Sequence, residues 1–249
     1  MKTHKVTILP HLIKFIPQVD SSIADDSLNL YGFDLDHTII QPKSGAVFAR
    51  GSNDWKFMEF GGKQTLQKLI KLVLGESNAF VVVFTNQGGV VTVPTTAKSC
   101  LNFTNKIKNL LEHIEGVENG SKFLERLFIY AAPKKPASFG KKKVAGTKSG
   151  RVNKSINSML AKTTKEKEQI DNKDIDDQVS IFTKMRKPET GMADAFISDL
   201  ELIFPKEKYK YNWKLYCGDA AGRKSDFSDA DKAFAETLKV PFVIPEEFF

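Results

Sequence analysis

The feature that most constrains the fold is a continuous apolar run, Ala79–Phe84, that stops abruptly at a polar segment. Its sequence, AFVVVF, is rich in β-branched and aromatic residues and has no polar alternation. Such a run is typical of a strand that is buried on both faces, as in a parallel sheet covered by helices. Thr85–Gly89 (TNQGG) follows directly, so this strand should deliver polar groups to one edge of the sheet.

Strands and helices are expected to alternate along the rest of the chain. Val6–Ile16 contains a proline and predicts edge strands or a short hairpin. The alternation predicts an α/β fold with a doubly wound parallel sheet and helices on both faces. Further strands are expected at Leu28–Phe33, Leu127–Ala132, Leu215–Cys217 and Val240–Ile244, and helices at Leu66–Val73, Lys98–Ile114, Thr190–Ile203 and Asp229–Leu238.

Three of the predicted strands end at polar clusters. These clusters are Asp34-Leu35-Asp36, Thr85-Asn86 and Gly218-Asp219. In open α/β sheets, ligands bind outside the carboxyl ends of the strands, where such side chains meet. The sequence therefore predicts a polar site at this edge.

Asp34 and Asp36 lie two residues apart and can do different chemistry. The carboxylate of Asp34 can attack phosphorus to give an aspartyl-phosphate. That of Asp36 can protonate the leaving oxygen and later deprotonate a water. Carboxylates are hard oxygen ligands, so Asp34, Asp36 and Asp219 together suit Mg²⁺. An Asp-x-Asp pair alone is also a common acidic turn, and only the other clusters favour the catalytic interpretation.

A phosphate at this edge would need hydrogen-bond donors and positive charge. Thr85 offers a hydroxyl, and the backbone of Asn86–Gly88 can offer N–H groups. Lys187 can supply a fixed charge beside Asp34. A buried lysine is costly without an anionic partner, so this placement makes sense only next to phosphate and carboxylate.

The segment Ala137–Ser180 differs from the rest of the chain in composition. It is rich in Lys, Ser, Thr, Asn and Gly, and we interpret it as an insertion that is disordered or weakly helical around Asn157–Glu168. Lys134–Ser180 holds 12 Lys/Arg and 6 Asp/Glu, so +6 of the net charge of +7 falls there. That excess suits contact with a polyanion, and equally a solvated loop.

Composition argues against several classes of protein. A hydrophobic fraction of 41% with 19 Phe is ample for a core, but the apolar runs are too short to span a bilayer, so no membrane association is expected. The N-terminus does not resemble a secretory signal. Cys100 and Cys217 show no ligand spacing and are expected to be reduced and partly buried. The four histidines form no ligand cluster.

Four ordered motifs resemble those of the haloacid dehalogenase superfamily. They are FDLDHTI (33–39), VVFTNQGG (82–89), RKP (186–188) and GDAAGR (218–223). More narrowly, the chain resembles the phosphatase part of polynucleotide kinase 3′-phosphatase, and the opening VTILPHLIKF resembles the fungal phosphatase-only members. The likeness covers nearly the whole chain apart from the insertion and includes Asp54-Trp55, RKPETGM, Asp226-Phe227-Ser228 and PEEFF.

This resemblance implies roles for individual residues at the centre of the site. Asp34 would be the nucleophile, and Asp36 the general acid and base with its backbone carbonyl on Mg²⁺. Thr85 would hold the phosphate and Lys187 would neutralise it. Asp219 would bind the metal ion.

Other residues are assigned around this centre. Asp226 would act behind the metal ligands, and Asn86 would join Thr85 in binding the phosphate. Arg186 and Arg223 are candidate contacts to DNA phosphates, with surface ion pairs as the alternative. Trp55 could stack on a base, although core packing is favoured. In addition, Asp229 is expected to cap the last long helix or to pair nearby.

The chain departs from the bifunctional enzymes in one respect. No G-x-x-x-x-G-K-[ST] motif occurs, since neither Gly61-Gly62-Lys63 nor Gly146-Thr147-Lys148 fits it. Kinase activity is therefore not expected.

We expect one phosphatase domain over residues 1–249, with the insertion at about 137–180. The expected reaction removes the 3′-phosphate from DNA ends during strand-break repair, with Mg²⁺ as cofactor and DNA with 3′-phosphate ends as partner. The protein is expected to be a monomer, and the sequence identifies no repair protein as a partner. A nuclear location is the family expectation, with a short basic run at Lys141–Lys143.

Two alternatives stay open from the residues themselves. One is a phosphatase for small molecules such as sugar or histidinol phosphates, which the superfamily also contains. The other is a noncatalytic DNA-end binder, against which the intact set of Asp34, Asp36, Lys187 and Asp219 argues.

Overall fold

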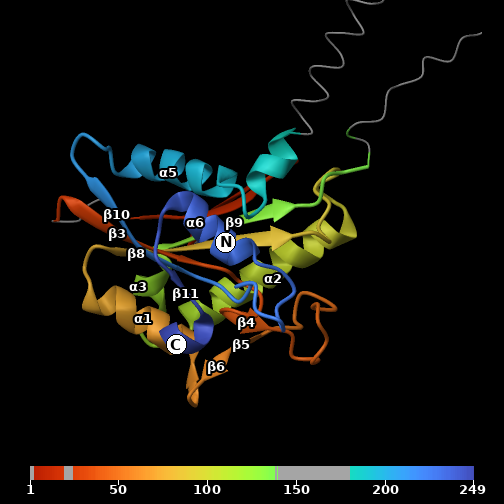
Figure 1. The fold of residues 1–249 in the computed structure, drawn as a ribbon, viewed down its shortest axis with the longest axis horizontal. Helices are drawn as coiled ribbons and strands as arrows, with labels where there is room; N and C mark the ends of the chain where they lie inside the picture. Colours follow the sequence, from red (N-terminus) through yellow and green to blue (C-terminus); the bar gives the residue numbers. More distant parts are fainter. Residues whose placement is uncertain (1–2, 20–24, 138, 140–179) are drawn as a thin grey trace, which may run out of the picture.

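A computed structural model describes residues 3–19, 25–137, 139 and 180–249. Its centre is a seven-stranded sheet in the order β1-β2-β9-β8-β3-β10-β11, which lies between two layers of helices (Figure 1). Strands β9, β8, β3, β10 and β11 pair in parallel, whereas β2 pairs antiparallel with β9 and with β1. This arrangement confirms the predicted doubly wound α/β sheet with an edge hairpin.

The elements have the following bounds. The strands of the large sheet are β1 (His4–Ile8), β2 (Ile13–Pro17), β3 (Ser27–Phe33), β8 (Ala79–Gln87), β9 (Leu127–Pro133), β10 (Lys210–Cys217) and β11 (Phe242–Val243). Two small sheets pair β4 (Ile40–Gln41) with β5 (Lys56–Phe57), and β6 (Glu59–Phe60) with β7 (Lys63–Gln64). The helices are α1 (Thr65–Gly75), α2 (Lys98–Glu115), α3 (Gly120–Leu124), α5 (Gly191–Ile203), α6 (Ala230–Leu238) and α7 (Pro245–Phe248).

Strand β8 shows why the sheet has a core on each face. Val81 and Val83 join the core that the sheet forms with α1, α2 and α3. Val82 and Phe84 point the other way, into the core formed with α5 and α6. Because alternate side chains of a strand face opposite sides, an uninterrupted apolar run fills both cores at once.

Some boundaries differ from the sequence-based expectation. Strand β10 begins at Lys210 rather than Leu215, and β11 is limited to Phe242–Val243. The four short strands β4 to β7 and helix α3 were not predicted. The prediction that the insertion is disordered or weakly helical concerns residues outside those that the structure describes, apart from Ala137, Phe139 and Ser180.

Three smaller expectations can be checked. Trp55 is buried against Phe57 and His113, with ring centroids 5.7 and 5.8 Å away, as core packing predicts. Cys100 and Cys217 are both free and buried. In the described part of the chain, no helix is long and apolar enough to cross a membrane.

Candidate active site

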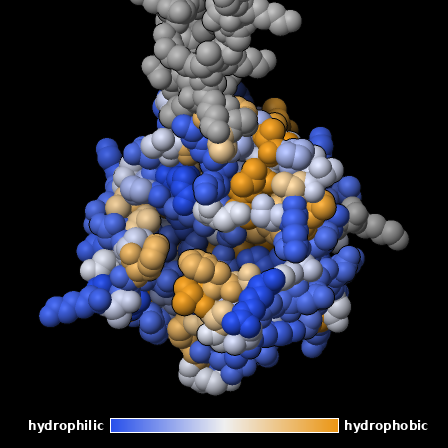
Figure 2. Space-filling view, turned by 90° about the vertical axis from the view of Figure 1, so that its right-hand side faces the viewer, coloured by the Kyte–Doolittle hydropathy of each residue, from blue (hydrophilic) through white to orange (hydrophobic). Residues whose placement is uncertain are grey.

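The carboxyl ends of three neighbouring strands form the site. Strand β3 lies between β8 and β10 in the sheet, so the residues that follow β3 are flanked by Thr85 near the end of β8 and by Asp219 after β10. The arrows of β8 and β9 in Figure 1 point toward the face that is turned to the viewer in Figure 2. That face is hollowed near its middle, with hydrophilic residues on the left of the hollow and hydrophobic residues to its right and below it.

The backbone after β3 turns sharply and so separates two carboxylates that are close in sequence. The Asp34 N–H donates to the Cys217 carbonyl at 2.9 Å, which ties the start of the turn to β10. His37 then adopts a left-handed conformation with φ 63°, and its N–H donates to the Ile40 carbonyl at 2.7 Å. The side chains of Asp34 and Asp36 are thereby held in different surroundings.

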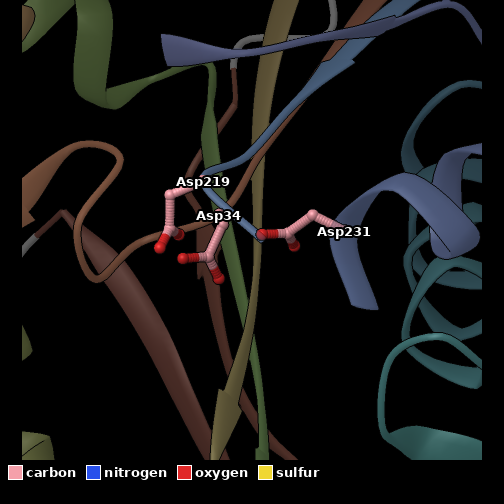
Figure 3. A group of neighbouring side chains, drawn as sticks. All are labelled: Asp34, Asp219 and Asp231. Carbon is pink, nitrogen blue, oxygen red and sulfur yellow. The ribbon is translucent and has the colours of Figure 1, made fainter. Parts of the chain in front are cut away.

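Asp34 belongs to a cluster of three carboxylates. Asp34, Asp219 and Asp231 each offer an oxygen, and these oxygens lie within 4.8 Å of one another. Figure 3 shows Asp34 between Asp219, which follows β10, and Asp231, which projects from α6. We call these three residues the aspartate cluster.

Lys187 is the cation of the aspartate cluster. Its Nζ donates to Asp34 Oδ1 and to Asp231 Oδ1, both at 2.6 Å, and to the Tyr216 hydroxyl at 2.9 Å. The side chain of Lys187 is only 3% exposed. The prediction that Lys187 lies beside Asp34 thus agrees with the geometry, and Asp231 supplies a second anion.

Burial and nearby negative charge both raise the pKa values of Asp34 and Asp219. Burial raises the pKa of Asp34 well above its usual range, the charges of Asp231 and Asp219 raise it further, and Lys187 opposes them. Burial and then Asp231 likewise raise the pKa of Asp219. For Lys187, burial acts to lower the pKa, but Asp231 and Asp34 outweigh it and hold the pKa above its ordinary value.

The donor set fits a hard divalent cation such as Mg²⁺. Three carboxylates share one lysine, so the ionised cluster has an excess of negative charge in a buried position, which a divalent cation would offset. Asp231 is already occupied, because it accepts from Lys187, from the Tyr216 hydroxyl at 3.0 Å and from the Ala220 N–H at 3.0 Å. Asp34 and Asp219 retain more free oxygen capacity for a metal ion.

The carboxylate of Asp36 lies apart from the aspartate cluster. It accepts from Lys106 Nζ at 3.0 Å and from Gln87 Nε2 at 2.8 Å. Gln87 Nε2 also lies 2.9 Å from Thr85 Oγ1, which connects Asp36 to the predicted phosphate-binding hydroxyl. Among the described residues no hydrogen bond uses the Asp36 carbonyl, and its predicted contact with Mg²⁺ stays a prediction.

The side chains of Asn86 and Arg186 both form hydrogen bonds to backbone groups of the protein. The Asn86 side chain accepts from the Lys187 N–H and donates to the Lys187 carbonyl, both at 3.0 Å. The second N–H of this side-chain amide stays available to a phosphate, as does the Asn86 backbone. Arg186 donates to the Ala132 carbonyl at 3.2 Å and lines a depression together with Lys135 and Pro188.

Arg223 and Asp226 brace the loop that carries Asp219. Arg223 Nε lies 2.9 Å from Asp226, and its Nη2 donates to the Asp219 carbonyl at 3.2 Å. Asp226 also accepts from the N–H groups of Ala221 and Arg223. Asp226 thus orders the backbone that follows Asp219, and Arg223 is engaged in an ion pair. The predicted role of Asp226 behind the metal ligands stays a prediction.

Several residues of the site were missed by the sequence analysis. Asp231, Tyr216, Lys106 and Gln87 all contact a predicted residue but were not singled out. The run DFSDAD (226–231) offered an acidic signal, yet only Asp226 and Asp229 were singled out from it. Asp229 is at the N-cap position of α6 but its side chain makes no capping hydrogen bond, whereas Asp231 faces the cluster.

Sequence comparison places the chain among known proteins. The profile described as "polynucleotide kinase 3 phosphatase" matches residues 29–249. Polynucleotide 3′-phosphatase from Saccharomyces cerevisiae is 44% identical, with 99% of each chain covered. The protein of that name from Saccharomyces mikatae is 45% identical over 99% of this chain and 96% of its own. A bifunctional polynucleotide phosphatase/kinase from Schizosaccharomyces pombe is 27% identical over 87% of this chain and 36% of its own.

The doubly wound sheet, with aspartates and a lysine gathered at its carboxyl edge, defines a class of α/β protein whose polar site lies at the strand ends. Within that class, the match over residues 29–249 and the two Saccharomyces relatives confirm the narrower resemblance. The chain belongs to the polynucleotide kinase 3 phosphatase family.

Proposed function

We propose that this protein is a Mg²⁺-dependent DNA 3′-phosphatase that converts a 3′-phosphate end into a 3′-hydroxyl. The observation that carries the proposal is the buried contact between Asp34 and Lys187 within the aspartate cluster. A carboxylate in a negative cluster, with one lysine and room for a cation, suits attack on a phosphate. The two polynucleotide 3′-phosphatases that are 44% and 45% identical to this chain direct the proposal to the 3′ end of a polynucleotide.

In the first step, an oxygen of Asp34 forms a bond to phosphorus as the bond from phosphorus to the 3′ oxygen breaks. The electron pair of that bond goes to the 3′ oxygen, which takes a proton from Asp36 and leaves as a hydroxyl. Lys187 and the Thr85 hydroxyl would hold the phosphoryl oxygens. Lys187 already contacts Asp34, and its third N–H, which reaches the Tyr216 hydroxyl, would turn to a phosphoryl oxygen.

In the second step, a water attacks the phosphorus of the aspartyl-phosphate and gives its proton to Asp36. The bond from phosphorus to Asp34 breaks, inorganic phosphate leaves, and both carboxyl groups return to their starting forms. Mg²⁺, held by Asp34, Asp219 and the Asp36 carbonyl, would screen the repulsion between nucleophile and phosphate. Asp231 would stay with Lys187 and keep that lysine in place.

A cationic depression supports a polyanionic substrate. Lys43 and Arg50, from the loop after β4, lie with Lys98 at the start of α2 around an open depression of about 710 Å³. Asp54 shapes this loop, because it accepts from Ser44 and from the Arg50 N–H at 2.8 Å. Lysine and arginine side chains that line a depression of this kind can bind DNA phosphates, and such contacts do not depend on the base sequence.

The decisive test is release of inorganic phosphate from a 3′-phosphorylated oligonucleotide, with a 5′-phosphorylated strand as control. Release is expected only from the 3′ end and only with Mg²⁺, and Asp34→Asn should abolish it. Normal release by Asp34→Asn would rule out the nucleophile proposed here. Equal release from sugar phosphates would favour a small-molecule phosphatase, and tight DNA binding without turnover would favour a noncatalytic binder.

The remaining parts of the proposal follow from the sequence. The chain contains no P-loop motif, so it is proposed to lack 5′-kinase activity, which a γ-³²P-ATP transfer assay would test. A role in strand-break repair, a nuclear location and a monomeric state are proposed with it. Fluorescent tagging in cells and light scattering in solution address the last two.

A further inference from the structure

Lys106 occupies a position in α2 where an apolar residue would be expected. It is 6% exposed and lies one turn from Phe103 and Leu110 and next to Ile107, all of which are buried. Burying an ammonium costs several kcal/mol unless it is paired, and an apolar replacement of a buried pair is often neutral or stabilising. Stability alone therefore does not account for a lysine at this position.

The partner of Lys106 is Asp36. Lys106 Nζ donates to Asp36 Oδ1 at 3.0 Å, and Gln87 Nε2 donates to Asp36 Oδ2 at 2.8 Å. Both oxygens of the carboxylate are thus held from different elements, α2 and β8. No other ion pair of Lys106 exists within the described residues.

These two donors fix where the Asp36 carboxylate points. The Asp36 side chain is 37% exposed, so without them it could rotate about two bonds in solvent. Asp36 is instead kept out of the aspartate cluster, which holds Asp34, Asp219 and Asp231. A group that transfers a proton must lie within hydrogen-bond reach of the reacting oxygen, and geometry decides its efficiency before acidity does.

We propose that Lys106 is a positioning residue that orients Asp36 for proton transfer to the leaving oxygen. The inference rests on the proposed function, because it needs Asp36 as general acid. It differs from a structural role in one measurable respect: loss of Lys106 should matter only when the leaving group needs a proton.

The test compares two leaving groups on the same DNA. One oligonucleotide carries an ordinary 3′-phosphate, whose leaving group is an alkoxide. The other carries a 3′-S-phosphorothiolate, in which sulfur bridges carbon and phosphorus. Its leaving thiolate has a conjugate acid with a pKa of about 8.5, like that of a cysteine thiol, and departs without protonation. The single-turnover rate at which each oligonucleotide is released from its terminal phosphate is measured with saturating protein.

Lys106→Met is expected to slow release of the oxygen-linked strand by about 10- to 100-fold, which is a partial loss of the roughly 10²–10⁴-fold that general acid catalysis contributes. Release of the sulfur-linked strand should change less than about threefold. Asp36→Asn should show the same selectivity with a larger loss. Lys108→Met removes the same charge from the same helix, away from Asp36, and should leave both rates unchanged. Lys106→Gln keeps a hydrogen-bond donor, so its rate of release of the oxygen-linked strand should lie between those of Lys106→Met and the parent. If Lys106→Met does not fold, Lys106→Gln is used in its place.

Two outcomes would overturn the positioning role. Equal losses on both substrates would show that Lys106 acts through folding or overall charge. A raised half-saturation concentration with an unchanged maximal rate would show that it binds the DNA instead. If the parent protein does not act on either oligonucleotide, the proposed DNA function fails, and the same comparison is made with glycerol 2-phosphate and p-nitrophenyl phosphate.

Discussion

Lys187 satisfies two buried aspartates with one ammonium, which makes it a residue on which the stability of the site depends. We predict that Lys187→Met lowers the free energy of unfolding by about 3–5 kcal/mol, because it leaves Asp34 and Asp231 buried without their cation. Turnover should be lost as well. Urea denaturation in the absence of divalent metal measures the first effect.

A matched surface pair gives the control. Lys206 lies 2.5 Å from Glu201, but their side chains are 54% and 37% exposed, so Lys206→Met should cost less than about 1 kcal/mol. Equal costs for the two substitutions would contradict the view that the aspartate cluster needs its lysine.

Residues of the site were predictable from the sequence where they lie within a recognisable local motif. Asp34 and Asp36 follow an apolar strand, and Lys187 lies within a short motif, so the sequence singles them out once the four ordered motifs are taken together. Lys106 and Asp231 are different, because each is one polar residue in an amphipathic helix. Only the packing of α2 and α6 on the sheet turns these two side chains toward Asp36 and Lys187.

Among the elements, the turn from β10 to the α6 region depends on the absence of a side chain at Gly218. A Cβ there would lie 2.4 Å from Asp231 Cγ. Gly218→Ala should therefore displace Asp231 from Lys187, slow turnover by at least tenfold and destabilise the protein by about 1–3 kcal/mol.

Gly75 is the suitable comparison for that substitution. It lies at the end of α1, and a Cβ there meets nothing within 4 Å, so Gly75→Ala should leave turnover intact. Turnover of Gly218→Ala at the parental rate would show that the contact between Asp231 and Lys187 can adapt to the displacement.

His4 in β1 is a buried, uncharged histidine that hydrogen-bonds to the backbone at the start of β9. His4 Nε2 lies 2.8 Å from the Leu127 carbonyl, and burial lowers the His4 pKa to about 4, with the bond to Leu127 opposing it. The unfolded chain takes up this proton near pH 6.5 and the folded chain only near 4. Stability from this group is therefore full above pH 6.5 and is lost as the pH falls toward 4, by about 3 kcal/mol.

His4→Gln tests this assignment because glutamine can donate to Leu127 but does not titrate in this range. As the pH falls from about 7 to about 4.5, the parent should lose unfolding free energy that the variant keeps. The variant should therefore become more stable relative to the parent. A difference that stays constant over that interval would mean that the His4 pKa is not lowered.

The central strands β3 and β9 were predicted to within one residue, whereas β8 continues past the predicted Phe84 to Gln87 and so contains Thr85. Strand β10 extends back to Lys210 through KYNWK, in which exposed and half-buried positions alternate. The short β11 pairs only with Tyr216 and Cys217, so the first part of β10 is an edge and tolerates lysines. The two-residue strands β4 to β7 are too short to produce a periodic pattern.

On the scale of the whole molecule, the charge excess and the chemistry lie in different parts of the chain. Phe139 and Phe182 have ring centroids 5.3 Å apart, so a short linker can replace residues 140–179. We predict that this deletion leaves turnover of the 3′-phosphate intact and reduces the salt dependence of DNA binding, because most of the net charge is removed.

Fluorescence anisotropy of a labelled oligonucleotide, titrated at several salt concentrations with Asp34→Asn proteins, measures that dependence without turnover. The loop variant Lys43→Gln/Arg50→Gln is the counterpart, since it removes positive charge from the cationic depression while retaining the insertion. An unchanged salt slope after deletion would argue against a DNA role for residues 140–179.

The order of the strands also bears on when the protein becomes active during its synthesis. Strands β3, β8 and β9 pair with one another and can assemble early, but the other edge of β3 is covered only by β10. Asp231 joins Lys187 later still. A nascent chain on the ribosome therefore carries Asp34 on an open strand edge, prone to association with other chains. It should need chaperone cover before it gains a working centre.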